Sequence, residues 1–76
     1  MSDLIFLNSI VDDLNCTICR YDDDYVLVGY DYKNFEKSIL RLVFNDDLDV
    51  SLLTQSIFVD NSYRIYFKFR YLLERS

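Results

Sequence analysis

The chain has 76 residues, of which 51% are hydrophobic and 17% aromatic, and it carries a formal net charge of −5. This length suits one compact domain spanning residues 1–76, and the apolar content is too high for a disordered segment. No apolar run approaches the roughly 18 residues of a membrane span, and Ser2 and Asp3 stand where a secretory signal carries basic residues. We therefore expect a cytoplasmic protein that does not associate with membranes.

The residue types that serve most enzymes are missing. The sequence has no His, no Trp and no Pro, and Gly29 is its single glycine. It therefore lacks the usual proton shuttle, the commonest metal ligand and any glycine-rich phosphate-binding loop. The eleven Asp cluster in predicted turns, where carboxylates stay solvated and ionised and do not acquire the raised pKa of a general acid. We expect no enzymatic activity, no cofactor and no bound metal.

Cys16 and Cys19 form a C-x-x-C motif. A zinc site needs two further ligands, and the chain has no third Cys and no His. In a strand, residues at this spacing lie about 10 Å apart on opposite faces, too far for a disulfide. We expect two reduced thiols that pack as small hydrophobic side chains, as in proteins of the cytosol.

The first segment, Ser2–Leu14, has the apolar spacing of a helix. Apolar side chains recur at helical intervals along it, at Leu4, Leu7, Val11 and Leu14. Ser2 can cap the N-terminus, and Asp3 favours the first turn.

From Asn15 onward the apolar residues alternate, which is typical of strands. Cys16–Tyr21 and Tyr25–Tyr32 are predicted as a hairpin whose three-residue connection is Asp22–Asp24. In the second strand one face carries Tyr25, Leu27, Gly29 and Asp31, and the other carries Val26, Val28, Tyr30 and Tyr32. Glycine inside a strand marks a bulge, a bend or the close approach of another backbone, and we favour a bend over the N-terminal helix.

The middle of the chain is ambiguous between helix and strand. Lys33–Asn34 is predicted as a turn, and the apolar residues of Phe35–Phe44 fit either period. The end of that stretch is rich in β-forming residues, which favours a strand over Ser38–Asn45, and a further strand is predicted at Ser51–Val59. Asp60–Ser62 is a turn signal.

The final strand, Tyr63–Tyr71, has the clearest alternation in the chain. One face carries Tyr63, Ile65, Phe67, Phe69 and Tyr71, and the other carries Arg64, Tyr66, Lys68 and Arg70. If this strand ends the sheet, it presents an exposed edge, and domains this small often need a partner for stability. We therefore expect a homodimer.

Together these elements make an α+β fold with an N-terminal helix packed on an antiparallel sheet of about four to five strands. A helix before a bent sheet is similar to the Sm-like layout, and Gly29–Asn34 (GYDYKN) resembles a turn region of that family. The glycine-bearing motif of the family's last hairpin is absent. The resemblance covers one short segment and implies, as an alternative, an Sm-like nucleic-acid-binding module.

Negative charge is concentrated in the first part of the chain. Residues 1–32 hold seven acids and one base, a balance of −6, whereas residues 33–76 hold six acids and seven bases, a balance of +1. Alternate strand residues lie about 6.7 Å apart, close to the spacing of phosphates along one DNA strand, so Asp side chains at this spacing suit a nucleic-acid-binding groove. The predicted partner-binding residues are the acids of this region and the tyrosines beside them: Asp12, Asp13, Asp22, Asp23, Asp24, Asp31, Tyr21, Tyr25 and Tyr30.

In general character, this small acidic domain rich in Asp and Tyr resembles the phage-encoded inhibitors of bacterial defence, namely anti-CRISPR and anti-restriction proteins. The resemblance is one of composition, and no specific motif carries it. It implies an inhibitor that binds a basic, nucleic-acid-handling protein in the cytoplasm of a host cell. A toxin-neutralising immunity protein and a small structural or assembly component are alternatives.

Direct nucleic-acid binding is a competing hypothesis. Arg64, Lys68 and Arg70 flank Tyr66 on one face of the final strand, an arrangement that can contact phosphates and stack a base. The net charge of −5 repels polyanions, and we expect acids on a neighbouring strand to neutralise these bases. Direct binding to nucleic acid is therefore disfavoured.

Overall fold

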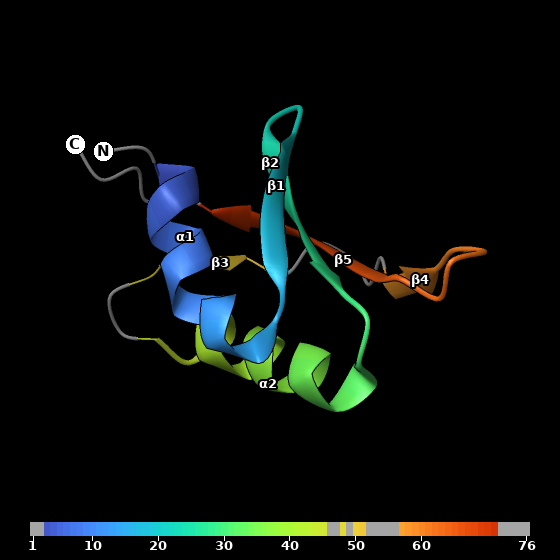
Figure 1. Ribbon diagram of the computed structural model, residues 1–76. Coiled ribbons are helices and arrows are strands. Elements are labelled where there is room, and N and C mark those ends of the chain that lie inside the picture. The colour runs from blue at the N-terminus through green and yellow to red at the C-terminus, as the bar shows by residue number, and fades with distance from the viewer. Residues whose placement is uncertain (1–2, 46–47, 49, 52–56, 72–76) are drawn as a thin grey trace.

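The computed structural model describes residues 3–45, 48, 50–51 and 57–71. The elements follow in the order α1 (Asp3–Val11), the 3-10 helix η1 (Asp12–Leu14), β1 (Thr17–Tyr21), β2 (Asp24–Gly29), α2 (Tyr32–Val43), β3 (Val50–Ser51), β4 (Ile57–Val59) and β5 (Ile65–Tyr71). Figure 1 shows the helices beside a twisted antiparallel sheet. The predicted α+β fold, with an N-terminal helix packed on the sheet, is confirmed.

β5 lies in the interior of the sheet. The strands pair in the order β1-β2-β5-β3, and β4 also pairs with β5. β2 runs along one side of β5, with Leu27 opposite Phe67, while β4 and β3 pair with successive parts of its other side. The final strand would present an exposed edge only if it ended the sheet, and it does not, because two short strands lie along its second edge.

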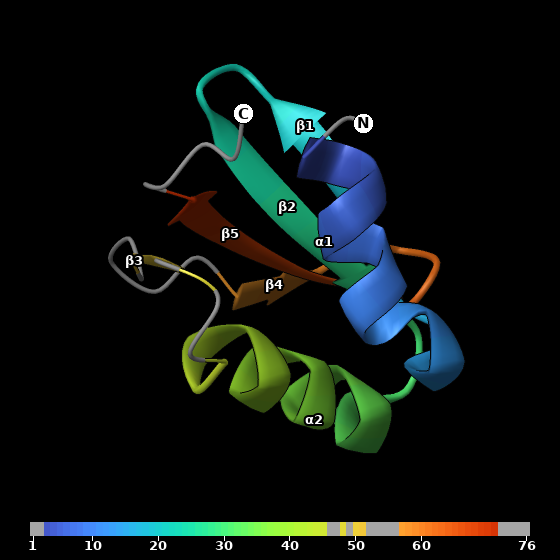
Figure 2. The same ribbon diagram turned by 90° about the vertical axis from the view of Figure 1, so that its left-hand side faces the viewer.

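One hydrophobic core joins the inner face of the sheet to both helices, which Figure 2 shows lying at an angle to each other against the sheet. The strand alternation directs every second side chain of β2 and β5 into this core. Its members include Leu7 and Val11 from α1, Phe35 and Leu42 from α2, and Ile18, Leu27, Phe67 and Phe69 from the sheet.

The predicted strand over Ser38–Asn45 is wrong, because Tyr32–Val43 form the helix α2. The predicted turn at Lys33–Asn34 is the first turn of this helix, and Asp31 caps it by accepting a hydrogen bond from the Lys33 N–H at 2.9 Å. Three side chains are buried at helical spacing: Phe35, Ser38 and Leu42. Burial of this stripe outweighs the β-propensity of the segment.

Gly29 makes space for α2, not for a bend over the N-terminal helix. A Cβ atom at this position would lie 2.8 Å from Cδ1 of Phe35 and 3.1 Å from Sγ of Cys16. Both of those side chains are buried. The glycine is therefore required by close packing against a side chain of α2.

Several element boundaries differ from those predicted: the second strand ends at Gly29 instead of Tyr32, and the final strand begins at Ile65 instead of Tyr63. α1 ends at Val11, and η1 continues to Leu14 before Asn15 adopts a left-handed conformation with φ +57°. Tyr21 and Asp24 are the last pair of the β1–β2 hairpin, so its loop has two residues instead of the predicted three. The strand predicted at Ser51–Val59 is seen only at its ends, and residues 52–56 lie outside the described residues. Among the described residues, no helix is long and apolar enough to cross a membrane.

Candidate functional site

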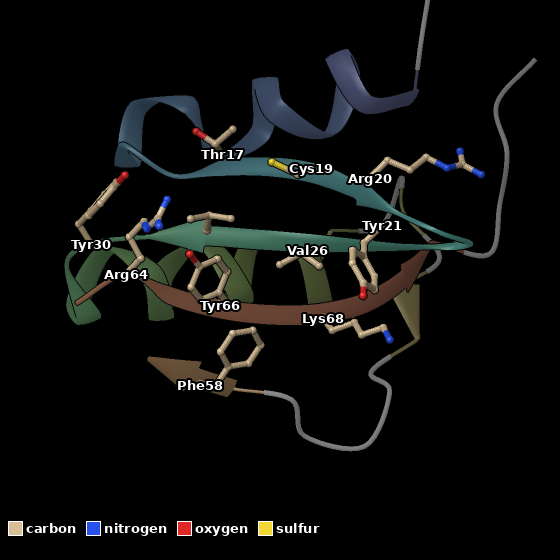
Figure 3. A pocket seen from close by; sticks show the side chains of 11 residues that line it. Thr17, Cys19, Arg20, Tyr21, Val26, Tyr30, Phe58, Arg64, Tyr66 and Lys68 are labelled. Atoms are coloured by element: carbon tan, nitrogen blue, oxygen red, sulfur yellow. The ribbon is translucent and has the colours of Figure 1, made fainter. Parts of the chain in front are cut away.

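The face of the sheet opposite the helices is hollowed by a groove of about 790 Å³, which we call the outer groove. Figure 3 shows that its side chains come from β1, β2, β4, β5 and the residues next to them. They are Thr17, Cys19, Arg20, Tyr21, Val26, Val28, Tyr30, Phe58, Arg64, Tyr66 and Lys68. The groove follows from the strand alternation, because the neighbours of buried inner residues point outward.

Four aromatic side chains line the outer groove. Phe58 stacks on Tyr66 with ring centroids 4.7 Å apart, and Tyr21 and Tyr30 lie toward opposite ends of the groove (Figure 3). Tyr21, Tyr30 and Phe58 are more than half exposed. Exposed aromatic side chains of this kind supply large contact areas and are typical of the residues that dominate binding energy at protein interfaces.

The basic side chains of β5 and its turn are paired with carboxylates. Asp24 on β2 is only 7% exposed, and its carboxylate lies 3.0 Å from Nε of Arg70 and 3.7 Å from Nζ of Lys68. Arg64 lies 3.0 Å from the carboxylate of Asp60. The expected neutralisation by an acid on a neighbouring strand is confirmed for Asp24. These bases form no row of unpaired cations along the outer face.

Asp60 organises the turn between β4 and β5, which lies where the sequence predicts a turn. Its carboxylate accepts hydrogen bonds from the N–H groups of Ser62 at 2.9 Å and Arg64 at 3.0 Å, and from the hydroxyl of Tyr66 at 2.7 Å. The bond from Tyr66, followed by the backbone donors, lowers the pKa of Asp60, and the same bond raises the pKa of Tyr66. Tyr63, in this turn, is 81% exposed and adopts a φ of +60°.

The predicted site residues around the β1–β2 hairpin have different environments. Asp22 and Asp23 are exposed at its tip, and within the described part of the chain their carboxylates make no ion pair. Asp24 is buried and forms ion pairs with Lys68 and Arg70. The prediction of Tyr25 as an exposed anchor is wrong, because it lies on the inner face, is 4% exposed and stacks on Phe69 at 5.8 Å.

The remaining predicted acids, Asp12, Asp13 and Asp31, lie at the other end of the hairpin. Asp12 and Asp13 precede β1 and Asp31 follows β2, so the five residues of β1, about 15 Å, separate them from the tip. Arg41 donates a hydrogen bond to Asp13 at 3.1 Å and holds the pKa of that carboxyl below its usual range. The six predicted acids therefore form two groups, and only the hairpin-tip group adjoins Tyr21 in the outer groove.

The two cysteines have different environments. Both are free, but Cys16 is buried whereas Cys19 is exposed in the outer groove. The expectation of two packed thiols is right for Cys16 and wrong for Cys19. The strand alternation that separates them places the second thiol on the outer face.

Several groove residues were not among the predicted site residues. The alternation groups Val26 and Val28 with Tyr30 on one face of their strand, but it does not show that this face is the outer one. Phe58 carries no such signal, because its position depends on the pairing of β4 with β5.

Comparisons with protein-family models, with curated proteins and with solved structures give no significant match. Function is therefore inferred from the outer groove and the hairpin tip themselves.

Proposed function

We propose that this protein is a small inhibitor that binds a basic, nucleic-acid-handling protein through the outer groove and the acidic hairpin tip. The observation that supports this most is the pairing of charges on the outer face. Its aromatic side chains are exposed, whereas Arg64, Lys68 and Arg70 are held by Asp60 and Asp24. Such a face offers aromatic anchors for a protein and few free cations for a phosphate backbone.

The negative charge of the hairpin tip indicates a partner with a positively charged surface. Asp22 and Asp23 project next to Tyr21, and the whole chain carries a net charge of −5. Carboxylates at the rim of an interface accelerate encounter with a basic surface and contribute less to the final affinity. Nucleic-acid-binding proteins are the class with extended basic surfaces, and an acidic surface competes there with phosphates.

An affinity capture with matched variants tests this function. The tagged chain is incubated with lysate of the cell that normally contains it, with and without nuclease. The expected result is nuclease-resistant retention of a basic protein, here called the captured partner. Tyr21→Ala/Tyr30→Ala should weaken its binding at least about 30-fold. Ile5→Ala/Phe44→Ala, which truncates similarly exposed side chains on α1 and directly after α2, should not.

The charge contribution is tested separately at the hairpin tip. Asp22→Asn/Asp23→Asn removes both charges, and Asn tolerates the φ of +53° at position 22. We expect slower association with the captured partner and a weaker dependence on salt, with a nearly unchanged dissociation rate. Retention of RNA or DNA without a protein, or equal loss in both aromatic and helical variants, contradicts the proposed function.

A further inference from the structure

β4 is an apolar strand at an edge of the sheet. Its three side chains, Ile57, Phe58 and Val59, are 51%, 53% and 59% exposed. The strand pairs with β5 on one side, and no described residue pairs with its other side. Edge strands of monomeric proteins usually carry a charge, a proline or a bulge that hinders further pairing, and these three residues carry no charge and no proline.

The edge formed by β1 is closed. The side-chain amide of Asn8, on α1, accepts a hydrogen bond from the Ile18 N–H at 2.6 Å and donates one to the Ile18 carbonyl at 3.1 Å. A neighbouring strand would make the same two bonds to Ile18, so α1 takes the place of a strand there. The side of the described sheet formed by β1 is therefore covered at Ile18, and β4 is the longer of the two strands, β3 and β4, that form its other side.

The ladder determines which backbone groups β4 presents at this edge. The Asp60 N–H donates to the Arg64 carbonyl at 3.1 Å, so these two residues form a hydrogen-bonded pair. Hydrogen-bonded and non-hydrogen-bonded pairs alternate along an antiparallel ladder. Phe58 therefore directs its N–H and carbonyl toward β5, and Ile57 and Val59 direct theirs toward the open edge.

We propose that β4 pairs with β4 of a second copy of this chain around a two-fold axis. Antiparallel pairing places Ile57 opposite the partner's Val59 and Phe58 opposite the partner's Phe58, and such an edge is self-complementary. The two sheets then join into one. The stacked rings of Phe58 and Tyr66 then lie beside the same two rings of the second copy. The aromatic surface of the outer groove therefore continues across the dimer.

The charge distribution favours a second copy at this edge. Residues 33–76, which include β4 and β5, have a balance of +1, whereas residues 1–32 have a balance of −6. Pairing through β4 brings the nearly neutral parts together, and the hairpin tip lies well away from β4 (Figure 1). A strand of three residues makes a small interface, so we expect dissociation at about 10–100 µM.

Sedimentation equilibrium of the full chain between about 10 and about 300 µM tests the dimer. We expect a monomer–dimer equilibrium whose dissociation constant rises at least about tenfold in Val59→Lys. Ile5→Lys, at an equally exposed site on α1, should leave the dissociation constant unchanged. Circular dichroism of each variant establishes that it is folded. A wild-type chain that stays monomeric, or a dimer that Val59→Lys does not affect, overturns the proposal.

A cross-link tests the register. In a Cys19→Ser background, Phe58→Cys should form a disulfide-linked dimer with oxidised glutathione, because opposite residues of a non-hydrogen-bonded pair have Cα atoms about 4.5 Å apart. Val59→Cys in the same background should react much more slowly, because its two copies lie diagonally, about 8 Å apart. Equal cross-linking at both positions, or none at position 58, contradicts the register.

Discussion

Replacing Gly29 with alanine tests how α2 packs against the sheet. The added Cβ would lie 2.8 Å from Cδ1 of Phe35, whereas ordinary carbon contacts are about 3.5–4.0 Å. Phe35 is 1% exposed and has little room to move. Overpacking of this kind costs about 1–3 kcal/mol, and alanine recovers about 0.4–1 kcal/mol by restricting the unfolded chain. We expect a loss of about 1–2 kcal/mol in the free energy of unfolding.

Urea unfolding followed by circular dichroism measures this loss as a lower midpoint at an unchanged m-value. In a thermal melt it corresponds to a decrease of about 4–8 °C per kcal/mol. The double variant Gly29→Ala/Phe35→Leu should be more stable than the sum of the two single changes by about 1 kcal/mol, because leucine vacates the ring position. An unchanged or higher midpoint in Gly29→Ala, or strict additivity in the double variant, would refute this packing.

Three further predictions concern stability and use urea unfolding as the measurement. Asp24→Asn should lower the free energy of unfolding by about 1–2 kcal/mol because it leaves two cations unpaired, whereas Asp23→Asn should change it by less than about 0.5 kcal/mol. Equal effects of the two variants contradict a structural role for Asp24. Tyr63→Asn should raise the free energy of unfolding by about 0.5–1 kcal/mol, since Asn tolerates a φ of +60° better, and a lower value speaks against backbone strain there. Because the pKa of Asp60 is lowered in the folded state, its contribution to the free energy of unfolding is fully present above about pH 4 and is lost as the pH falls through that lowered pKa. Tyr66→Phe should therefore make the free energy of unfolding less dependent on pH between about pH 2 and 6, and an unchanged dependence counts against the hydrogen bond.

The elements predicted correctly from the sequence are those with a strict local pattern. The inner face of β5 is buried as the alternation predicts from Ile65 to Tyr71, and the turn at Asp60–Ser62 precedes it. The helix α2 was not predicted, because the apolar residues of this segment fit the spacing of a strand as well as that of a helix. Its cap at Asp31 is a local signal, since the bond runs to the N–H two residues later, whereas the packing of Phe35 against Gly29 is a contact that the local pattern does not contain.

The candidate site was predicted only in part. Tyr21 and Tyr30 are exposed, as an anchor residue must be, and both line the outer groove, which was not predicted. The alternation placed Tyr25 on one face with Leu27, but it did not show which face of this strand is the buried one. Phe58 was missed because no local pattern specifies which strand lies beside β5.

Methyl-group NMR of the chain mixed with the captured partner tests most directly whether the outer face is the binding surface. Val26 and Val28 line the outer groove, Leu40 is 46% exposed on α2, and Val11 is buried in the core. Adding unlabelled partner should shift or broaden the methyl signals of Val26 and Val28 and leave those of Leu40 and Val11 unchanged. A perturbed Leu40 signal with unchanged Val26 and Val28 signals would contradict the proposed binding surface.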